Sequence, residues 1–452
     1  MKILIAGCGK VGETLVKQLS AEGNDLTVID SNAQKLEKLV EHYDIMAFRG
    51  NCASMETLRE AGAEHADLMI VATGSDEINL LCTMTAHGIN PNMHTIARIR
   101  NPEYAEQAYT MRDVFGLSLA FNPEKQAAVE IERLLKYPGF LKRDSFAKGR
   151  VEIVELKIDE NSKLCNVPLS TMYSIVKCRV LVCAVLRDGN TITPNGTFTL
   201  RAGDKIFVTA PSKNLALLLK NLDIVTHKVR RVILAGGGAV SYYLADALRD
   251  DRMNVTIIEK DKERCLALAN QLPDVNVICG DPGNQVLLES EGLSNSDALI
   301  TLTDKDELNV IISMYGSSCN IPQIVTKLDR VDDAKILQSL PIGSVICPKK
   351  LCCTTIVRYV RAMQTRTGGA LTIHSIANGQ AEAMEFMVDD NTMNCGKPLK
   401  QLKLKKNILI VCITRGGKIE IPGGDSFFQK GDSLVVVVSS GEVILQLNDI
   451  FE

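Results

Sequence analysis

Two glycine-rich loops, one at the start of the chain and one near its middle, are the feature that most restricts the possible folds. The first loop follows the apolar stretch KILIA and reads G-x-G-x-x-G, with Gly7, Gly9 and Gly12. The second follows RVILA and keeps the first two glycines, with Ser241 at the third position. Such a loop between a strand and a helix is typical of phosphate-binding α/β folds. We therefore expect two domains of this kind in one chain.

The two loops belong to an internal repeat that spans the whole chain. Residues 3–30 align without a gap to residues 232–259, and shorter matching stretches continue downstream. The ends of the two halves also match each other, at residues 181–210 and 409–438. The chain is thus organised as an A segment followed by a B segment, and then by the same pair again.

The A segments predict parallel sheets, and the B segments predict small β-rich domains. In each A segment, short apolar strands alternate with amphipathic helices, which fits a sheet covered by helices on both faces. Each B segment contains a hairpin-turn sequence, RDGN or RGGK, and little helix. The expected fold is α/β, with two Rossmann-like doubly wound sheets, each followed by a small β-rich α+β domain. The expected domains cover residues 1–140, 141–227, 228–367 and 368–452. The stretches 123–136 and 348–361 are expected to be crossover helices that join each Rossmann lobe to its B segment.

The first glycine loop predicts a binding site for an adenine nucleotide. Gly7 permits the tight turn, Gly9 lets the backbone approach a diphosphate, and Gly12 lets the helix pack on the sheet. The second strand ends at Asp30, whose carboxylate is placed to accept hydrogen bonds from ribose hydroxyls. An acid at this position repels a 2′-phosphate and disfavours NADP. It does not distinguish NAD from ATP, ADP or AMP, because all of them contain adenosine and phosphate.

Other residues at the carboxyl ends of the strands are expected to complete this site, because ligands of open parallel sheets bind there. Asn51 follows the third strand, and Thr73 and Gly74 follow the fourth. Arg98 ends a later strand, where it could pair with phosphate or lie on a solvated surface. Lys10, inside the loop, could add positive charge near the phosphates or face solvent.

The second half repeats this arrangement with substitutions. Serine is small enough for close helix packing at position 241, and a glutamate can still reach a ribose. We therefore expect a second nucleotide site, and the alternative is an empty structural copy. The equivalent positions hold Gly236 for Gly7, Gly238 for Gly9, Glu259 for Asp30, Asp281 for Asn51, Thr303 for Thr73 and Lys327 for Arg98.

Composition excludes several other classes of protein. The net charge is −3, Trp is absent and aromatic residues make up 4% of the chain, so nucleic-acid binding is not expected. No apolar run approaches the roughly 20 residues of a membrane-spanning helix, and MKILIAG is too short for a signal peptide, which predicts a soluble cytosolic protein. The 14 cysteines form no C-x-x-C or metal-ligand pattern, so reduced thiols and no metal site are expected. A redox role stays open for Cys8 and Cys52, which neighbour elements of the first site.

The sequence shows no catalytic machinery. None of the six histidines lies beside a persuasive partner, and neither G-x-S-x-G nor G-x-x-x-x-G-K-[ST] occurs. The B segments offer no cluster of catalytic side chains for a substrate pocket. The chain is therefore expected to bind nucleotide as a signal without chemical turnover. The alternative is an NAD-dependent oxidoreductase.

The doubled arrangement resembles the TrkA family of proteins with two RCK domains, each made of a TrkA-N and a TrkA-C part. The resemblance rests on AGCGKVG with Asp30, ATGSDEIN, AGGGAVS with Glu259, and the paired segments LRDGNTITP…LRAGDKIFV and TRGGKIEIP…FQKGDSLVV. It implies a non-enzymatic regulatory subunit that binds NAD(H) and ATP or ADP. It also implies a homotetrameric ring that gates potassium uptake through a TrkH- or TrkG-like transporter, peripherally bound at the inner face of the cell membrane.

Carried over by position, the resemblance extends the two sites along their loops. With the residues singled out above, the first site would comprise Gly7, Cys8, Gly9, Lys10, Val11, Gly12, Asp30, Asn51, Thr73, Gly74 and Arg98. The second would comprise Gly236, Gly237, Gly238, Ala239, Val240, Glu259 and Thr303. Ser241 and Lys327 depart from the family pattern, which bears on the affinity or the ligand of the second site. The resemblance adds no catalytic or metal-binding residue.

Overall fold

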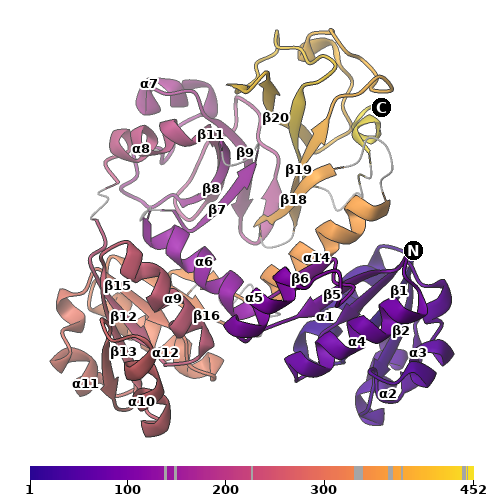
Figure 1. Cartoon of the computed structure of the whole chain (residues 1–452). Coiled ribbons are helices and arrows are strands. Elements are labelled where there is room, and N and C mark those ends of the chain that lie inside the picture. Colours follow the sequence, from indigo (N-terminus) through magenta and orange to yellow (C-terminus); the bar gives the residue numbers. More distant parts are fainter. Residues whose placement is uncertain are drawn as a thin grey trace. The chain divides into compact units, whose positions relative to one another are not determined.

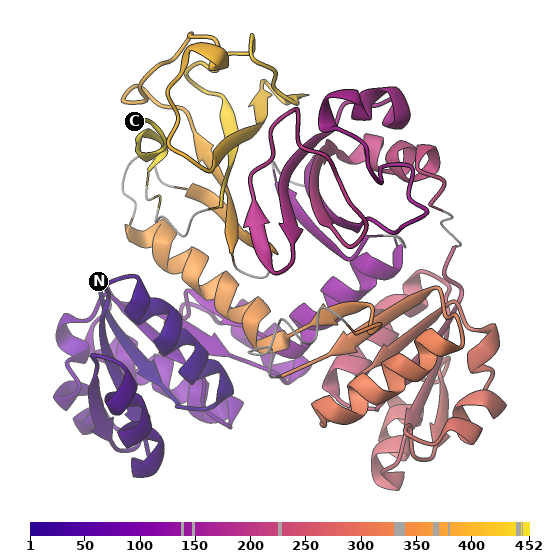
Figure 2. The same cartoon turned by 180° about the vertical axis from the view of Figure 1, so that it is seen from behind.

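The computed structural model describes residues 1–136, 140–146, 150–224, 228–329, 340–364, 370–377, 380–439, 444 and 446–452. These residues form two parallel and two antiparallel sheets, which alternate along the chain as the A and B segments do (Figures 1 and 2). The domain limits expected near residues 140, 228 and 368 fall in or beside the stretches 137–139, 225–227 and 365–369, which lie outside the described residues. Those limits therefore stay predictions.

The first parallel sheet has the strand order β3-β2-β1-β4-β5-β6. Its strands are β1 (Lys2–Ala6), β2 (Asp25–Asp30), β3 (Met46–Arg49), β4 (Leu68–Val71), β5 (His94–Arg98) and β6 (Leu119–Phe121). The helices that connect them are α1 (Lys10–Ala21), α2 (Ala33–His42), α3 (Met55–Glu60), η1 (Ala63–His65), α4 (Asp76–Ile89) and α5 (Pro102–Thr110). The chain winds in opposite directions from β1, so the loops after β1 and β4 meet at the switch point where ligands bind in such sheets.

The second parallel sheet has the equivalent order, β14-β13-β12-β15-β16-β17. Its strands are β12 (Arg231–Ala235), β13 (Asn254–Glu259), β14 (Asn276–Cys279), β15 (Ala298–Thr301), β16 (Gln323–Lys327) and β17 (Ser344–Ile346). The helices are α9 (Ala239–Asp250), α10 (Lys262–Gln271), α11 (Gln285–Ser290), η3 (Leu293–Asn295) and α12 (Asp306–Ser318). The register is also equivalent, since Ala6 pairs with Ile29 and Ala235 pairs with Ile258. The predicted pair of doubly wound sheets is confirmed.

The central strands of the first sheet are covered on both faces, which explains why β1 and β4 are almost entirely apolar, whereas the edge strand β3 is largely exposed. Leu4 and Ala6 of β1 pack in a cluster with Leu58 of α3 and Cys82 of α4. The intervening residue Ile5 points to the opposite face and is also fully buried. A strand covered on both sides favours apolar side chains at every position, so the expectation of helices on both faces is met.

The B segments form two five-stranded antiparallel sheets that share one core. The first has the order β10-β9-β11-β8-β7 and the second β18-β19-β22-β20-β21. Residues from both sheets, among them Cys183, Phe207, Val411 and Val435, belong to one buried cluster. The first domain contains β7 (Lys142–Phe146), β8 (Val151–Lys157), η2 (Leu169–Thr171), α7 (Met172–Val176), β9 (Leu181–Arg187), β10 (Asn190–Ile192), β11 (Lys205–Pro211) and α8 (Ser212–Asn221). The second contains β18 (Ala370–Ile376), β19 (Ala381–Met387), η5 (Leu399–Gln401), β20 (Ile408–Arg415), β21 (Lys418–Glu420), β22 (Ser433–Val438) and η6 (Leu447–Ile450).

The segments that repeat between the B domains form an ion pair in each, between a buried aspartate and a partly exposed arginine. The Nε and Nη2 atoms of Arg187 each donate to the carboxylate of Asp204 at 2.7 Å. Arg415 binds Asp432 in the same way, at 3.0 and 2.8 Å. Each guanidinium also lies over a phenylalanine ring, 4.7 Å from the ring centre in the first domain and 4.8 Å in the second. The repeated arginine and Gly-Asp positions therefore fix how the central hairpin meets the last long strand.

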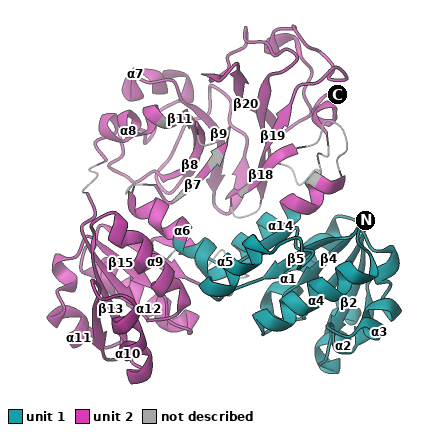
Figure 3. Ribbon diagram, in the orientation of Figure 1, with its two compact units in different colours: residues 1–128, 347–357 teal, residues 129–346, 358–452 magenta. Residues whose placement is uncertain are grey.

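Two long helices follow the parallel sheets, α6 (Pro123–Lys136) and α14 (Pro348–Gln364). The chain divides into two compact units within these helices (Figure 3). Unit 1 contains residues 1–128 and 347–357, and unit 2 contains residues 129–346 and 358–452. In unit 1, the Cys353 thiol of α14 lies 3.7 Å from the Val11 carbonyl oxygen of α1. In unit 2, Lys136 at the end of α6 pairs with Asp251, just after α9, at 2.9 Å. Each helix thus contacts the Rossmann domain of the other half, a swap that the sequence did not predict.

We expect Asp204→Asn to destabilise the first B domain, because it leaves the Arg187 guanidinium without its counter-charge. Losing a hydrogen bond to a charged group costs about 1.5–3 kcal/mol, which for a domain of this size lowers Tm by about 6–24 °C. Thermal unfolding followed by circular dichroism measures this shift. The control Asp425→Asn breaks the exposed pair between Lys400 and Asp425 and should change Tm by less than about 1 °C. Equal shifts for the two variants would show that the pair between Arg187 and Asp204 is not important for stability.

Candidate nucleotide-binding sites

The first glycine of each loop is required by the backbone. Gly7, after β1, has a φ of +99°, and a Cβ there would lie 2.8 Å from the carbonyl oxygen of Ala72, after β4. Gly236 has a φ of +113°, and its Cβ would lie 2.9 Å from the Leu302 carbonyl. Only glycine fits both the left-handed conformation and the close approach. The loops after the first and fourth strands of each sheet therefore touch at the switch point.

The second glycine of each loop opens the start of a helix to free space. Gly9 and Gly238 are the N-caps of α1 and α9, and neither helix has a side-chain hydrogen bond at its cap. A Cβ at either glycine would meet no atom within 4 Å. The N–H groups of a helix N-terminus carry partial positive charge and suit an anion. Each loop therefore has the form of a backbone cradle for phosphate.

The third position shows how the two halves differ. A Cβ at Gly12 would lie 1.9 Å from the Gly7 carbonyl oxygen, so the first loop excludes any side chain there. In the second half, the hydroxyl of Ser241 donates a hydrogen bond to the Gly236 carbonyl oxygen and the serine is fully buried. The second loop thus accommodates a side chain by bonding it to the same carbonyl group.

The acids at the ends of β2 and β13 bind the loops directly. Oδ2 of Asp30 accepts the N–H of Cys8 at 2.6 Å, and Oε2 of Glu259 accepts the N–H of Gly237 at the same distance. The other carboxylate oxygens accept backbone N–H groups at the starts of the following helices, at 2.8 Å. A carboxylate has about four acceptor sites, so both acids keep capacity for ribose hydroxyls.

The loops after β4 and β15 are held by two buried asparagines, for which no role was predicted from the sequence. Oδ1 of Asn79 accepts both the hydroxyl and the N–H of Thr73, at 2.6 and 3.0 Å. Asn309 binds Thr303 in the same way, at 2.7 and 2.9 Å. Each asparagine is fully buried, and its Nδ2 donates to the carbonyl that ends the next strand. Their recurrence at the same place in both repeats was the available sequence signal.

A cation at the end of the next strand points at each of these loops. The Arg98 guanidinium donates to the Thr73 carbonyl oxygen, and Lys327 Nζ lies 3.2 Å from the Thr303 carbonyl oxygen. Arg98 is half-buried, which lowers its pKa, and its Nε has no partner among the residues that the structure describes. Arg98 therefore does not lie on a solvated surface, and Lys327 repeats its position.

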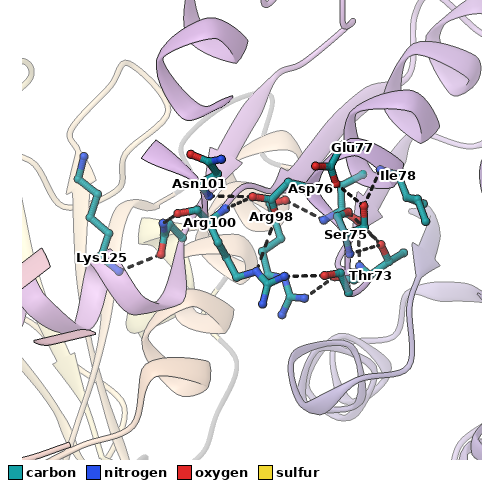
Figure 4. A network of polar contacts seen from close by, with 12 residues as sticks. Thr73, Ser75, Asp76, Glu77, Ile78, Arg98, Arg100, Asn101 and Lys125 are labelled. Atoms are coloured by element: carbon teal, nitrogen blue, oxygen red, sulfur yellow. Dashed lines mark hydrogen bonds and ion pairs between the residues drawn. The ribbon is translucent and has the colours of Figure 1, made fainter. Parts of the chain in front are cut away.

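A second layer of contacts fixes the loop after β4 against the loop after β5 (Figure 4). The Asp76 carboxylate accepts the N–H groups of Arg100 and Asn101, each at 2.8 Å. The Arg100 side chain donates to the Gly74 carbonyl oxygen at 2.5 Å. A Cβ at Gly74 would again meet no atom within 4 Å. Thr73 and Gly74 are thus held rigidly beside open space.

Some predicted site residues lie where they can contribute little through their side chains. Val11 and Val240 are each 5% exposed, so only their backbone groups face the loop. Asn51 and Asp281 each accept the backbone N–H two residues further on, which turns both side chains towards their own loops. Lys10 and Ala239 are exposed at the first helical positions.

The thiol of Cys8 lies against Asp30, and burial followed by that carboxylate raises the pKa of Cys8 to about 12. A protonated thiol is a poor nucleophile, which argues against the redox role left open for Cys8.

Two further classes of feature are missing from the described part of the chain. No described helix combines the length and the apolar character needed to cross a bilayer. Nor do the described residues bring together three or more His, Cys, Asp or Glu side chains in a group suited to a metal ion.

Known domain families match the A and B segments of both halves, and known proteins match the whole chain. The TrkA-N domain matches residues 3–120 and 232–348, and the TrkA-C domain matches residues 153–223 and 383–451. The chain is 30% identical over 443 residues to the Trk system potassium uptake protein TrkA homolog of Archaeoglobus fulgidus, covering 98% of each. The chain belongs to the TrkA family. This family consists of non-enzymatic regulatory RCK proteins, so the alternative of an NAD-dependent oxidoreductase is not supported.

A second TrkA relative and two solved structures agree with this assignment. The Trk system potassium uptake protein TrkA of Haemophilus influenzae is 29% identical over 460 residues, covering 100% of this chain and 99% of that protein. The GsuK channel bound to NAD has a TM-score of 0.62 at 16% identity, covering 97% of this chain and 77% of the channel. GsuK bound to ADP has a TM-score of 0.51 at 13% identity, covering 80% of this chain and 69% of that chain. At these identities the GsuK structures support the RCK fold alone.

We expect Gly12→Ala to disrupt the first loop, because the added methyl group would overlap the Gly7 carbonyl oxygen. Overpacking of this kind costs about 1–3 kcal/mol, and the distorted loop should also lose any affinity for nucleotide. The matched control is Gly88→Ala in α4, a helical glycine whose Cβ would meet no atom within 4 Å. That change should stabilise the protein by about 0.5–1 kcal/mol. Urea unfolding of both variants measures the difference, and a neutral Gly12→Ala would contradict the close packing.

Proposed function

We propose that this chain is the nucleotide-sensing regulatory subunit of a potassium uptake system, with one adenine-nucleotide site in each half. The observation that carries the proposal is the repeated loop geometry. In both halves an acid binds the loop N–H at 2.6 Å, the following helix has no side-chain cap, and the second glycine faces open space. Two relatives are named as Trk potassium uptake proteins, which supplies the physiological role.

The proposed ligands are NAD(H) and ATP or ADP. The helix N-terminus and the loop N–H groups would hold the phosphates, Asp30 or Glu259 would bind the ribose, and the cation at Arg98 or Lys327 would balance phosphate charge. The residues assigned above to the two sites, and the four domain limits, are part of this proposal. GsuK structures with NAD and with ADP are consistent with these ligand classes in the RCK fold.

We further propose that copies of the chain assemble into a tetrameric ring that docks on a TrkH- or TrkG-like transporter at the inner face of the membrane. The helices α4 and α12 support the assembly, because each exposes apolar side chains on the face turned away from its sheet. Leu81 and Met84 of α4 are 51% and 38% exposed, and the aligned Ile311 and Met314 of α12 are 60% and 39% exposed. Exposed apolar helix faces at equivalent positions in both halves suit contacts with further copies of the same chain.

The crossover helix α14 could transmit a conformational change from the first nucleotide site to the rest of the ring. Its first part contacts α1 of unit 1 through Cys353, directly behind the phosphate cradle. Its last part is anchored in unit 2, where Arg361 binds Glu382 of β19 at 3.1 Å. A nucleotide that prefers one position of α1 would bias α14, and allosteric coupling is typically about 1–3 kcal/mol per site.

We expect Asp30→Ala to weaken nucleotide binding at the first site and Glu259→Ala at the second, because each removes charge-assisted hydrogen bonds to ribose. Such bonds contribute about 1.5–3 kcal/mol, so each affected Kd should rise by about 10- to 100-fold. Isothermal titration of full-length protein with NAD, NADH, ATP and ADP measures this effect. Glu41→Ala, an exposed acid on α2, is the control, and the melting temperature without ligand checks that each variant is folded. Unchanged affinities in the folded double variant would contradict the proposed sites.

We expect Leu81→Asp together with Ile311→Asp to reduce the size of the assembly, because charges would be buried at contacts between copies. Light scattering after gel filtration should show a tetramer for the unmodified protein and smaller species for the variant. The control Tyr173→Asp changes an apolar side chain of α7 that is 65% exposed and should leave the mass unchanged. An unmodified protein that is monomeric, or a variant that keeps the full mass, would argue against this interface.

A further inference from the structure

Two cysteines flank Glu259 in the second parallel domain. Cys279 is the last residue of β14 and pairs with Glu259 of β13 in the register of the sheet. Cys265 belongs to α10, and its thiol donates to the Glu259 carbonyl oxygen at 3.2 Å. The N–H of Gly280, which follows Cys279, donates to the same Glu259 carbonyl oxygen at 2.8 Å. A side chain from a helix and a side chain from a strand end thus meet beside the proposed ribose acid.

The two thiols differ in their access to solvent. Cys279 is exposed, whereas Cys265 is 7% exposed. Burial, followed by the neighbouring thiol of Cys279, raises the pKa of Cys265 to about 11. An exposed thiol can be reached by a small oxidant, and a buried neighbour within contact distance can then react with the oxidised sulfur. The pair therefore has the arrangement of an attacking and a resolving cysteine.

We propose that Cys279 and Cys265 form a reversible disulfide when the protein meets hydrogen peroxide. The Cys279 thiolate attacks one peroxide oxygen, the O–O bond breaks, and the other oxygen leaves as water after taking up a proton. The Cys265 sulfur then attacks the sulfenic sulfur of Cys279, the S–S bond forms, and the hydroxyl group leaves as a second water with the Cys265 proton. Two thiols and one peroxide give one disulfide and two waters, and a thiol such as glutathione restores the reduced pair by exchange.

A second thiol pair in the first parallel domain provides an internal contrast. The Cys82 thiol donates to the Cys52 carbonyl oxygen at 2.9 Å, so these two cysteines also lie close together. These cysteines are 7% and 0% exposed, so neither is open to an oxidant while the domain is folded. The two cysteines of each pair lie close together in both domains, but only the Cys265–Cys279 pair includes a thiol exposed to solvent. We expect the exposed pair to react and the buried pair to stay reduced.

The disulfide would act on the second nucleotide site, a consequence that rests on the proposed function. Arg264 precedes Cys265, and its Nε donates to the Gly237 carbonyl oxygen of the glycine loop at 2.8 Å. The aligned residue of the first half, Lys35, is exposed. A bond of about 2.05 Å between the sulfurs would tie the first turn of α10 to the end of β14 and hold Arg264 on the loop. We therefore expect the oxidised protein to bind nucleotide more weakly at this site.

The test begins with the full-length protein, reduced and then treated with hydrogen peroxide in its folded state. Peptide mass spectrometry after blocking free thiols should find a Cys265–Cys279 cross-link that a thiol reductant removes. Cys279→Ser should abolish this cross-link, and the control Cys395→Ser, at another exposed cysteine, should leave it in place. The absence of the cross-link from folded protein, or an equally fast Cys52–Cys82 cross-link, would overturn the proposal.

The effect on the site is measured separately by titrating nucleotide into the reduced and oxidised protein. We expect Kd at the second site to rise at least about fivefold on oxidation and to recover with reductant, with no change in Cys279→Ser. A cross-link without any change in affinity would overturn the regulatory consequence. If the reduced protein binds no nucleotide, the proposed function fails, while the mass spectrum still decides whether the thiol pair reacts.

Discussion

The contact between an acid at a strand end and the N–H that follows the first glycine of the loop is the interaction on which each Rossmann domain of this protein depends. It is 2.6 Å long in both halves, between Asp30 and Cys8 and between Glu259 and Gly237. The contact ties the end of the second strand to the turn after the first strand, which brings a carboxylate beside the open start of the helix. In the proposed sites, this one hydrogen bond would fix the ribose and phosphate positions relative to each other before any ligand arrives.

The two halves keep this geometry through different side chains. Glutamate replaces aspartate without lengthening the contact, and Ser241 fills the space of Gly12 by bonding to a loop carbonyl. Lys327 replaces Arg98 and still reaches the carbonyl of the equivalent threonine. The surroundings of the acids have diverged more, since a thiol lies against the first acid and a guanidinium on the loop beside the second. The two loops thus share their backbone geometry but differ in the side chains around the acids, which is consistent with two sites that respond to different ligands or conditions.

The sequence predicted what depends on local pattern and left out what depends on distant contacts. Glycine spacing, apolar strands and the repeat were sufficient for the two sheet types, because turn conformation and burial leave direct traces in residue type. The buried asparagines Asn79 and Asn309 escaped notice because a polar residue inside a helix has no distinctive spacing. The swap of α6 and α14 was also missed, because amphipathic periodicity identifies a buried face without identifying its partner.

The swap makes each long helix a shared element of the two halves of the chain. After Pro348 at its first turn, α14 contains no glycine or proline, so no residue in it favours a kink. Its Cys353 contacts α1 of the first half, while the part from Arg358 onward packs with the second half. Lys136 of α6 contacts Asp251, just after α9, so the first half also reaches the second Rossmann domain. Under the proposed function, a nucleotide in the first cradle would act on a helix that also belongs to the second half, which a chain with a single cradle could achieve only by pairing with another copy.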